Sequence, residues 1–137
     1  MTLILTLVAT NKIVQVSDRR LTLNGKMHEC NANKAICVSC SNAHFSIGYT
    51  GVAEIDGQRT DYWIVDQIFS IFSSGQQDIG KVGQLLTKKL TAAVSRLTYK
   101  GRPVRLEDKG LKLVLAGFGG PAGVVCTTTL SWRTLRT

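Results

Sequence analysis

Two segments with helical periodicity stand in the middle of this chain, and strand-like segments flank them on both sides. One helix is predicted from Asp61 to Phe72 and a second from about Ile79 to Tyr99, because apolar residues recur there at steps of three or four. Strands followed by helices and further strands favour an α+β fold over a doubly wound parallel sheet. The apolar residues expected in the core of this fold are Trp63, Ile64, Ile68, Ile71, Phe72, Val82, Leu86, Leu90, Ala93 and Leu97.

Strands are predicted wherever short apolar runs end at turn residues. Thr2 to Ala9 and Ile13 to Ser17 form two such runs, and Asn11-Lys12 separates them as a turn. The resulting hairpin returns Asp18 toward the beginning of the first strand.

The Asn24-Gly25 pair predicts a second hairpin, because both residues tolerate the positive φ of a type I′ turn. The chain from Asn33 should then run back beside Ile13 to Ser17, and Lys34 should arrive within a few residues of Asp18.

Beyond the helices, Leu111 to Ala116 reads as a strand, Gly117 to Gly123 as a glycine-rich turn, and Val124 to Leu130 as another strand. The 137 residues contain no internal repeat, low-complexity segment or linker, which indicates one domain.

Thr2, Asp18 and Lys34 follow one another at intervals of sixteen residues, 18 − 2 and 34 − 18. If Met1 is trimmed, the amine of Thr2 can act as the base for its own hydroxyl. Lys34 would keep that amine neutral through like-charge repulsion, and Asp18 would hold the ammonium of Lys34 in place. The same three residues are also compatible with ordinary roles, as an edge-strand residue, a turn former and a solvated lysine.

The residues around these positions extend the pattern. Together with Thr2, three segments resemble the amino-terminal half of proteasome β-type subunits and their bacterial relatives, within the N-terminal-nucleophile (Ntn) hydrolase superfamily. The resemblance covers residues 2 to 120 and implies a layered fold with antiparallel sheets packed against helices. The segments are Ser17 to Gly25, Asn33 to Ile36, and Gly48 to Ala53.

By this resemblance Thr2 is the nucleophile and Lys34 the catalytic lysine, while Asp18 and Arg20 match the family's Asp-x-Arg pair. Gly51 matches the residue whose backbone N–H forms the oxyanion hole. A glycine also suits that role chemically, because it lets the main chain approach a substrate closely. A plain strand-to-helix turn is the other interpretation of Gly51.

The resemblance also implies a set of substrate-binding residues beside Arg20. Thr22 and Ala53 fall where the family's backbone pairs with an extended peptide. Leu21 and Tyr49 fall where the family lines its specificity pocket.

The carboxy-terminal part departs from the family. Complete β-type subunits continue with more strands and a second pair of helices, whereas this chain ends at Thr137 and Thr127 to Arg133 does not match them. A truncated or frameshifted domain is the simplest interpretation. It would leave one apolar sheet face uncovered, which favours aggregation or binding of a partner. Met1, if retained, would block the amine of Thr2.

The net charge of +8 is unevenly distributed. From Lys81 onward there are eleven Lys or Arg residues and two Asp or Glu residues. Residues 1 to 80 have six Lys or Arg residues and seven Asp or Glu residues. A basic half can serve an acidic partner, but the basic residues are scattered and no aromatics interleave them, so nucleic-acid binding is not expected.

Neither a cofactor nor a metal is expected. Cys37 and Cys40 form a C-x-x-C, but residues three apart in a strand point to opposite faces. The cysteines are therefore interpreted as reduced residues of a cytoplasmic protein, and the histidines as structural. The other two cysteines are Cys30 and Cys126, and the two histidines are His28 and His44.

The apolar start from Leu3 to Ala9 is too short to span a bilayer and has no basic residue before it, so neither a membrane segment nor a signal peptide is expected. The sequence therefore predicts a cytoplasmic threonine hydrolase that cleaves peptide or protein substrates through an acyl-enzyme on Thr2. A homo-oligomeric ring is implied by the resemblance alone. The alternatives are a non-catalytic assembly subunit or decayed fragment of the same fold, and a basic module for an acidic partner.

Overall fold

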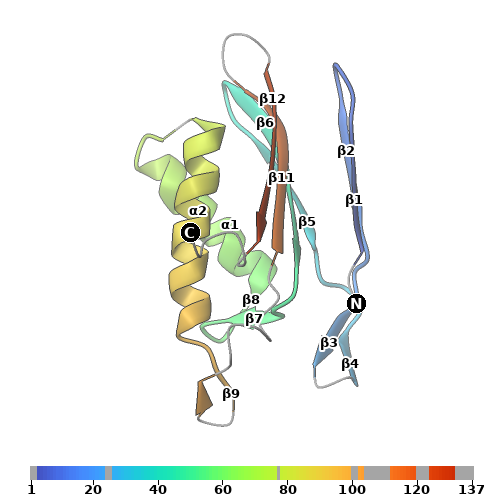
Figure 1. Ribbon diagram of the computed structural model, residues 1–137, viewed down its shortest axis with the longest axis vertical. Coiled ribbons are helices and arrows are strands. Elements are labelled where there is room, and N and C mark those ends of the chain that lie inside the picture. The colour runs from blue at the N-terminus through green and yellow to red at the C-terminus, as the bar shows by residue number, and fades with distance from the viewer. Residues whose placement is uncertain are drawn as a thin grey trace.

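The computed structural model describes residues 3–23, 26–76, 78–99, 102–103, 112–119 and 124–131. Over this part of the chain the fold is mixed α+β, with antiparallel strand pairs and two helices. Figure 1 shows three layers: the two helices, a four-stranded sheet beside them, and the β1–β2 hairpin on the other side of that sheet.

The four-stranded sheet has the order β12-β11-β6-β5. All of its neighbouring strands are antiparallel, and β6 is the most buried strand whose side chains are described. Among the described residues, the sheet supplies seven of the eighteen members of the buried apolar cluster. The strands are β5 (Ala35–Ser39), β6 (Ala43–Thr50), β11 (Lys112–Gly119) and β12 (Val124–Ser131).

The predicted glycine-rich turn after Ala116 begins too early, because residues 117 to 119 continue β11. A Cβ atom on Gly117 would lie 2.2 Å from the Cβ of Phe45, and one on Gly119 would lie 2.5 Å from Cδ1 of Ile79. Both glycines therefore serve close packing inside a strand.

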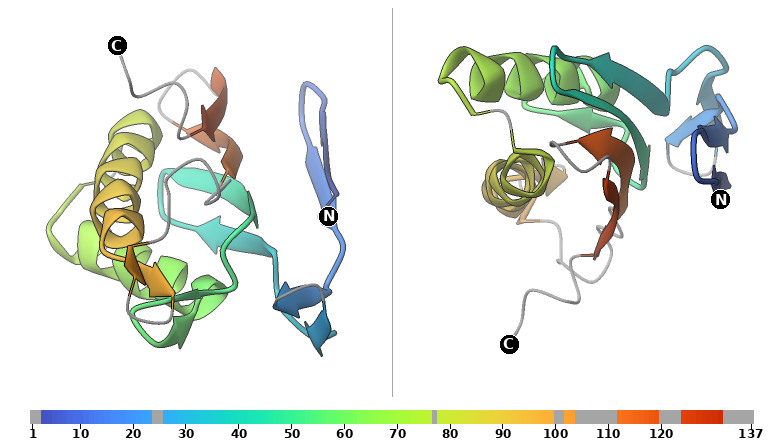
Figure 2. Two further views of the ribbon diagram at one scale, coloured as in Figure 1. Left: turned by 60° about the horizontal axis from the view of Figure 1, so that its bottom comes forward. Right: turned by 90° about the horizontal axis from the view of Figure 1, so that it is seen from above.

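The helices are α1 (Thr60–Ser73) and α2 (Ile79–Ser95), and they pack together over one face of the sheet, as the view from above shows (Figure 2). The side chain of Asp78 caps α2 by accepting the N–H of Lys81 at 2.9 Å. The predicted second helix is too long at its end, because Thr98–Tyr99 form strand β9, which pairs with β10 (Arg102–Pro103).

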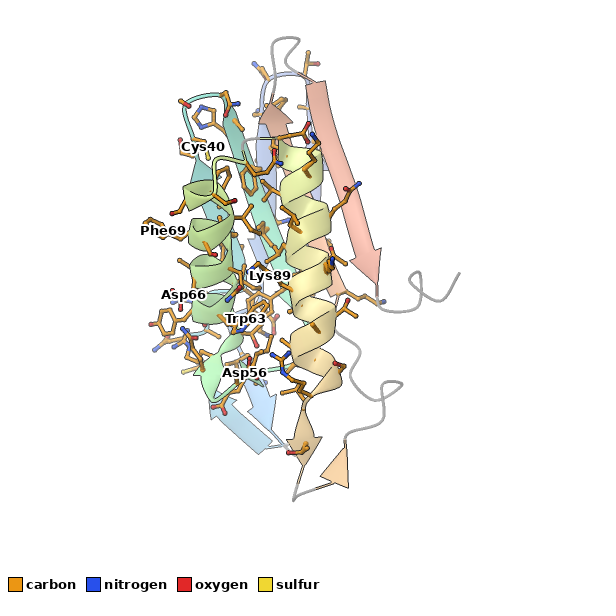
Figure 3. The ribbon with its side chains drawn as sticks, turned by 90° about the vertical axis from the view of Figure 1, so that its left-hand side faces the viewer. Cys40, Asp56, Trp63, Asp66, Phe69 and Lys89 are labelled. Carbon is orange, nitrogen blue, oxygen red and sulfur yellow. The ribbon has the colours of Figure 1, made fainter. Side chains whose placement is uncertain are left out.

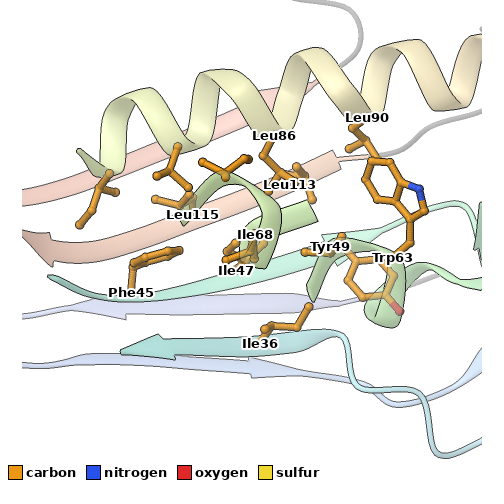
Figure 4. Packing of buried hydrophobic residues seen from close by; sticks show 14 of the residues in the cluster. Ile36, Phe45, Ile47, Tyr49, Trp63, Ile68, Leu86, Leu90, Leu113 and Leu115 are labelled. Atoms are coloured by element: carbon orange, nitrogen blue, oxygen red, sulfur yellow. The ribbon is translucent and has the colours of Figure 1, made fainter. Parts of the chain in front are cut away.

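The helical periodicity correctly predicted the core. Trp63 points between the two helices, whereas Phe69, on the opposite side of α1, is 76% exposed (Figure 3). All the apolar positions predicted from the two helices are buried or pack against the buried cluster. Figure 4 labels four of them within this cluster, Trp63, Ile68, Leu86 and Leu90. The sheet contributes further members to the same cluster: Ile36, Phe45, Ile47, Tyr49, Leu113 and Leu115.

The hairpin of β1 (Ile4–Val8) and β2 (Ile13–Ser17) packs on the other face of the sheet. Gln15 connects the two layers, because its Nε2 donates to the Val114 carbonyl at 3.3 Å and its Oε1 accepts from Ser46 Oγ at 2.6 Å. The sheet approaches the hairpin closely where it has no side chain: a Cβ on Gly48 would lie 2.9 Å from Cγ2 of Ile4.

The outer face of this hairpin is apolar and exposed. Its members alternate with the inward residues along both strands, and between 46% and 62% of each is accessible to solvent. We call this set the outer β1–β2 face; it consists of Leu3, Leu5, Leu7, Val14 and Val16.

Strand β5 does not pair with β2, contrary to the prediction for the chain after Asn33. It pairs with β6 through a tight turn in which the N–H of Cys40 donates to the carbonyl of Ala43 at 2.7 Å. The contact of β5 with β2 runs between layers and not along a hydrogen-bonded ladder. The remaining strand pairs are β3 (Leu21–Leu23) with β4 (Lys26–Glu29), and β7 (Glu54–Ile55) with β8 (Gln58–Arg59).

Candidate active site

A buried ammonium forms the centre of the candidate site. Only 2% of the Lys34 side chain is exposed, and its Nζ lies 3.2 Å from Oδ1 of Asp18, whose side chain is 35% exposed. The same Nζ donates to the backbone carbonyl of Arg20. A buried charge needs such partners, because burial without them costs several kcal/mol. The structure thus brings Asp18 and Lys34 together.

The backbone places this pair at the beginning of β1. Asp18 follows directly after β2, and its N–H donates to the carbonyl of Leu3 at 3.3 Å. Ile4 is paired with Ser17 in the same ladder. Thr2, the predicted nucleophile, lies outside the described residues, but its neighbour Leu3 is held against Asp18.

Lys34 comes to this position on a short connection between β4 and β5. The N–H of Ala32 donates to the carbonyl of Arg19 at 3.1 Å, and the N–H of Tyr49 donates to the carbonyl of Lys34 at 3.1 Å. The connection is therefore bound to the segment after β2 on one side and to the end of β6 on the other. This is why a lysine ahead of the central sheet reaches an aspartate that follows the outer hairpin.

Gly51 lies directly after β6, two residues beyond the Tyr49 that bonds to Lys34. Its φ of 117° is in the region that glycine adopts without strain, so the turn requires glycine at this position. The carbonyls of the next two residues are both bound to the start of α1: Val52 accepts from Thr60 Oγ1 at 2.7 Å and Ala53 accepts from Thr60 N–H at 3.0 Å. The loop is thus anchored on its helix side.

The residues predicted to bind substrate are distributed differently. Arg20 has an exposed side chain, and only its carbonyl takes part in the contact with Lys34. Leu21 is 4% exposed and Tyr49 is completely buried, so a ligand would reach either only after neighbouring side chains moved. The backbone of Thr22 pairs with that of Met27 in the β3–β4 hairpin.

A second buried charged group, Asp61, was not predicted from the sequence. Arg59 binds its carboxylate through two contacts, Nε to Oδ1 at 3.0 Å and Nη2 to Oδ2 at 2.5 Å. The N–H of Asn33 donates to Oδ2 at 3.1 Å. Burial raises the pKa of Asp61, but the hydrogen bonds from Arg59 and from the Asn33 backbone outweigh this and keep the pKa below its ordinary value. The sequence indicates this buried ion pair only by an acidic residue in the first turn of a predicted helix, two residues after an arginine.

The described side chains offer no metal centre, since no group of three or more His, Cys, Asp or Glu comes together among them. Cys30, Cys37 and Cys40 are free thiols, and burial raises the pKa of Cys40. His44 is bound through Nδ1 to Oγ of Ser39 at 2.8 Å. The side chains of His28 and Cys126 lie outside the described residues. Neither helix could span a membrane, being too short or insufficiently apolar.

In comparisons with known proteins, no protein-family model matches the chain, and no significant match was found among curated proteins or solved structures.

Proposed function

We propose that this protein is a proteasome-like N-terminal threonine hydrolase of the Ntn type, acting on peptide bonds. One observation carries the proposal: the buried ammonium of Lys34 lies 3.2 Å from Asp18, and Asp18 is bonded through its backbone to Leu3, directly after Thr2. A buried charge that only served folding could be replaced by apolar side chains without loss. Its position beside the beginning of β1 suits a group that acts on the chain terminus.

The proposed reaction begins after removal of Met1. The α-amine of Thr2 takes the proton of its own hydroxyl, and the oxygen attacks the carbonyl carbon of the peptide bond. The tetrahedral intermediate collapses, the amine returns the proton to the leaving nitrogen, and an ester links the substrate to Thr2. Water activated by the same amine then hydrolyses the ester.

Lys34 and Gly51 supply electrostatic support in this proposal. The ammonium of Lys34 favours the uncharged, basic form of a nearby amine, and Asp18 together with the Arg20 carbonyl keeps it from turning away. The N–H of Gly51 is assigned to the oxyanion, since the positive φ at this turn aims the backbone differently from the strand before it. For Ala53 the substrate contact falls to its N–H, because Thr60 already occupies its carbonyl.

Hydrolysis of a mixture of fluorogenic peptide amides tests the proposal, with mass spectrometry of the same sample to show that Met1 is gone. The processed protein is expected to release fluorophore, Thr2→Ser to retain part of the rate, and Thr2→Ala to lose it by at least about a hundredfold. Equal rates for wild type and Thr2→Ala would contradict the proposal. A processed, folded wild type without activity would favour the non-catalytic assembly subunit.

A further inference from the structure

The carboxylate of Asp61 joins the start of α1 to the connection that carries Lys34. Asp61 is 3% exposed, and its Oδ2 accepts the N–H of Asn33, the residue directly before Lys34, at 3.1 Å. Arg59 binds the same carboxylate at 3.0 Å and 2.5 Å, so the acceptor is held from the side of the helix. A contact between residues 28 positions apart in the chain is thus made by one charged side chain.

The connection needs such a contact because residues 31–34 belong to no strand. Where no ladder fixes the backbone, its position depends on individual hydrogen bonds. The described bonds are Arg19 Nη2 to the Asn31 carbonyl, Ala32 N–H to the Arg19 carbonyl, Asn33 N–H to Asp61, and Tyr49 N–H to the Lys34 carbonyl. Two of these bonds involve a charged group, the exposed bond from Arg19 and the shorter, part-buried bond to Asp61. Charge-assisted hydrogen bonds are roughly twice as strong as neutral ones.

Arg59 is itself held in place. Its guanidinium carbon lies 4.8 Å from the centre of the ring of Tyr62, which is in the first turn of α1, so the two side chains form a cation–π contact. Asp61 in the first helical turn also faces the positive end of the helix dipole. The position of α1 is therefore transmitted through Arg59 and Asp61 to the backbone of Asn33.

We infer that Asp61 is a positioning residue for Lys34: by fixing the backbone of Asn33, it keeps the Lys34 ammonium on Asp18 and on the Arg20 carbonyl. The consequence for catalysis rests on the proposed function. The coupling between Asp61 and Lys34 does not, since it can be measured in the resting protein.

Asp61→Asn is the test variant, because it preserves shape but removes the charge and leaves one acceptor oxygen for both Arg59 and Asn33. The probe is the 15Nζ resonance of Lys34 in lysine-labelled protein, assigned with Lys34→Arg. In Asp61→Asn, hydrogen exchange at Nζ should accelerate by about tenfold or more and the resonance should move toward those of exposed lysines, while the circular dichroism stays that of wild type. Asp61→Glu keeps the charge and should restore most of the wild-type signal.

Asp56→Asn is the matched control. Asp56 also pairs with an arginine, Arg96, at 3.3 Å, but on the exposed surface at the β7–β8 turn and without a bond to Asn33 (Figure 3). It should leave the Lys34 resonance unchanged. An Asp61→Asn protein whose Lys34 signal matches wild type would overturn the inference.

A second measurement needs no variant. In wild type the amide of Asn33 should exchange far more slowly than a free peptide, and exchange at the free-peptide rate would show that the contact is not maintained.

Labelling of Thr2 by an electrophile separates this inference from the proposed function. If the Lys34 resonance changes in Asp61→Asn but wild type is never labelled, the proposed hydrolase function is contradicted and the coupling between Asp61 and Lys34 is supported. If wild type is labelled at Thr2, but neither the labelling rate nor the Lys34 resonance changes in Asp61→Asn, the coupling is contradicted and the hydrolase function is supported.

Discussion

Lys34 and Asp18 meet at 3.2 Å although they come from different, neighbouring layers of the fold, Asp18 from the end of the outer hairpin and Lys34 from the connection into the central sheet. Their contact therefore depends on how the two layers pack, and it ties the beginning of β1 to the core. The predictions below separate what this pair contributes to folding from what it contributes to chemistry.

Lys34→Met should abolish the reactivity of Thr2 while leaving stability nearly unchanged. Methionine fills the buried volume without a charge, and Asp18 is exposed enough at 35% to be hydrated once its partner is gone. We expect the rate of epoxyketone labelling to fall by about a hundredfold or more and the free energy of unfolding in urea to change by less than about 1 kcal/mol. Lys12→Met, at an exposed lysine, is the control and should change neither quantity.

Asp61 should make stability depend on acid pH. Its pKa in the folded protein lies below the ordinary value of 3.8, so its stabilising effect is complete above that value and is lost as the pH falls through the folded pKa. Wild type should exceed Asp61→Asn by about 1–3 kcal/mol in the free energy of unfolding at pH 7. The difference should shrink as the pH falls below 3.8, and a difference that stayed constant down to pH 2 would contradict the assignment.

The outer β1–β2 face should be the main source of self-association. Replacing Leu5 and Val16, which lie opposite each other on this face, with threonine removes exposed apolar surface and keeps strand-forming residues. We expect less binding of the dye ANS and less aggregation on light scattering, with stability changed by about 0.5 kcal/mol or less. The same substitution at Ile4, which faces the sheet, should destabilise the protein instead; unchanged dye binding in the Leu5, Val16 variant would show that another surface is responsible.

Gly117→Ala should destabilise the protein by about 1–3 kcal/mol in chemical unfolding, because the new Cβ would lie 2.2 Å from the Cβ of Phe45. Gly83→Ala provides a contrast within α2. Its added Cβ would meet Leu115 Cδ1 at an ordinary 3.7 Å, and alanine favours a helix interior over glycine by about 1 kcal/mol. Equal effects of the two variants would contradict the packing described for β11.

The sequence predicts most reliably the features that are set by local periodicity. The core face of each helix follows from spacing alone, and so does the existence of the β1–β2 hairpin, which alternating apolar residues predict. Its turn lies one residue earlier than predicted, because Ala9 N–H bonds to the Lys12 carbonyl and leaves Thr10 and Asn11 at the tip. The glycines of β11 were misinterpreted as a turn, because their local propensity gives no sign of Phe45, which packs on Gly117, or of Ile79, which packs on Gly119. The extra length given to α2 has the same origin, since Leu97 continues the helical spacing after the helix has ended.

The candidate site divides in the same way. Two predicted hairpins placed Lys34 within a few residues of Asp18, but by a strand pairing that the structure does not have. The contact arises from packing of two layers, which no local pattern specifies. The bond from Asn33 to Asp61 spans 28 residues and depends on where α1 begins, so residue types alone do not reveal it. Charged residues in a helix's first turn are common, and only burial distinguishes this one.

The most direct test of the account is the reaction of the processed protein with a peptide epoxyketone, a reagent that consumes both a hydroxyl and the adjacent α-amine. Peptide mapping by mass spectrometry should find one adduct, on Thr2, in wild type and none in Thr2→Ala. An adduct at another residue, or none in a folded sample that has lost Met1, would contradict the claim that a lysine-supported amino terminus is the reactive centre.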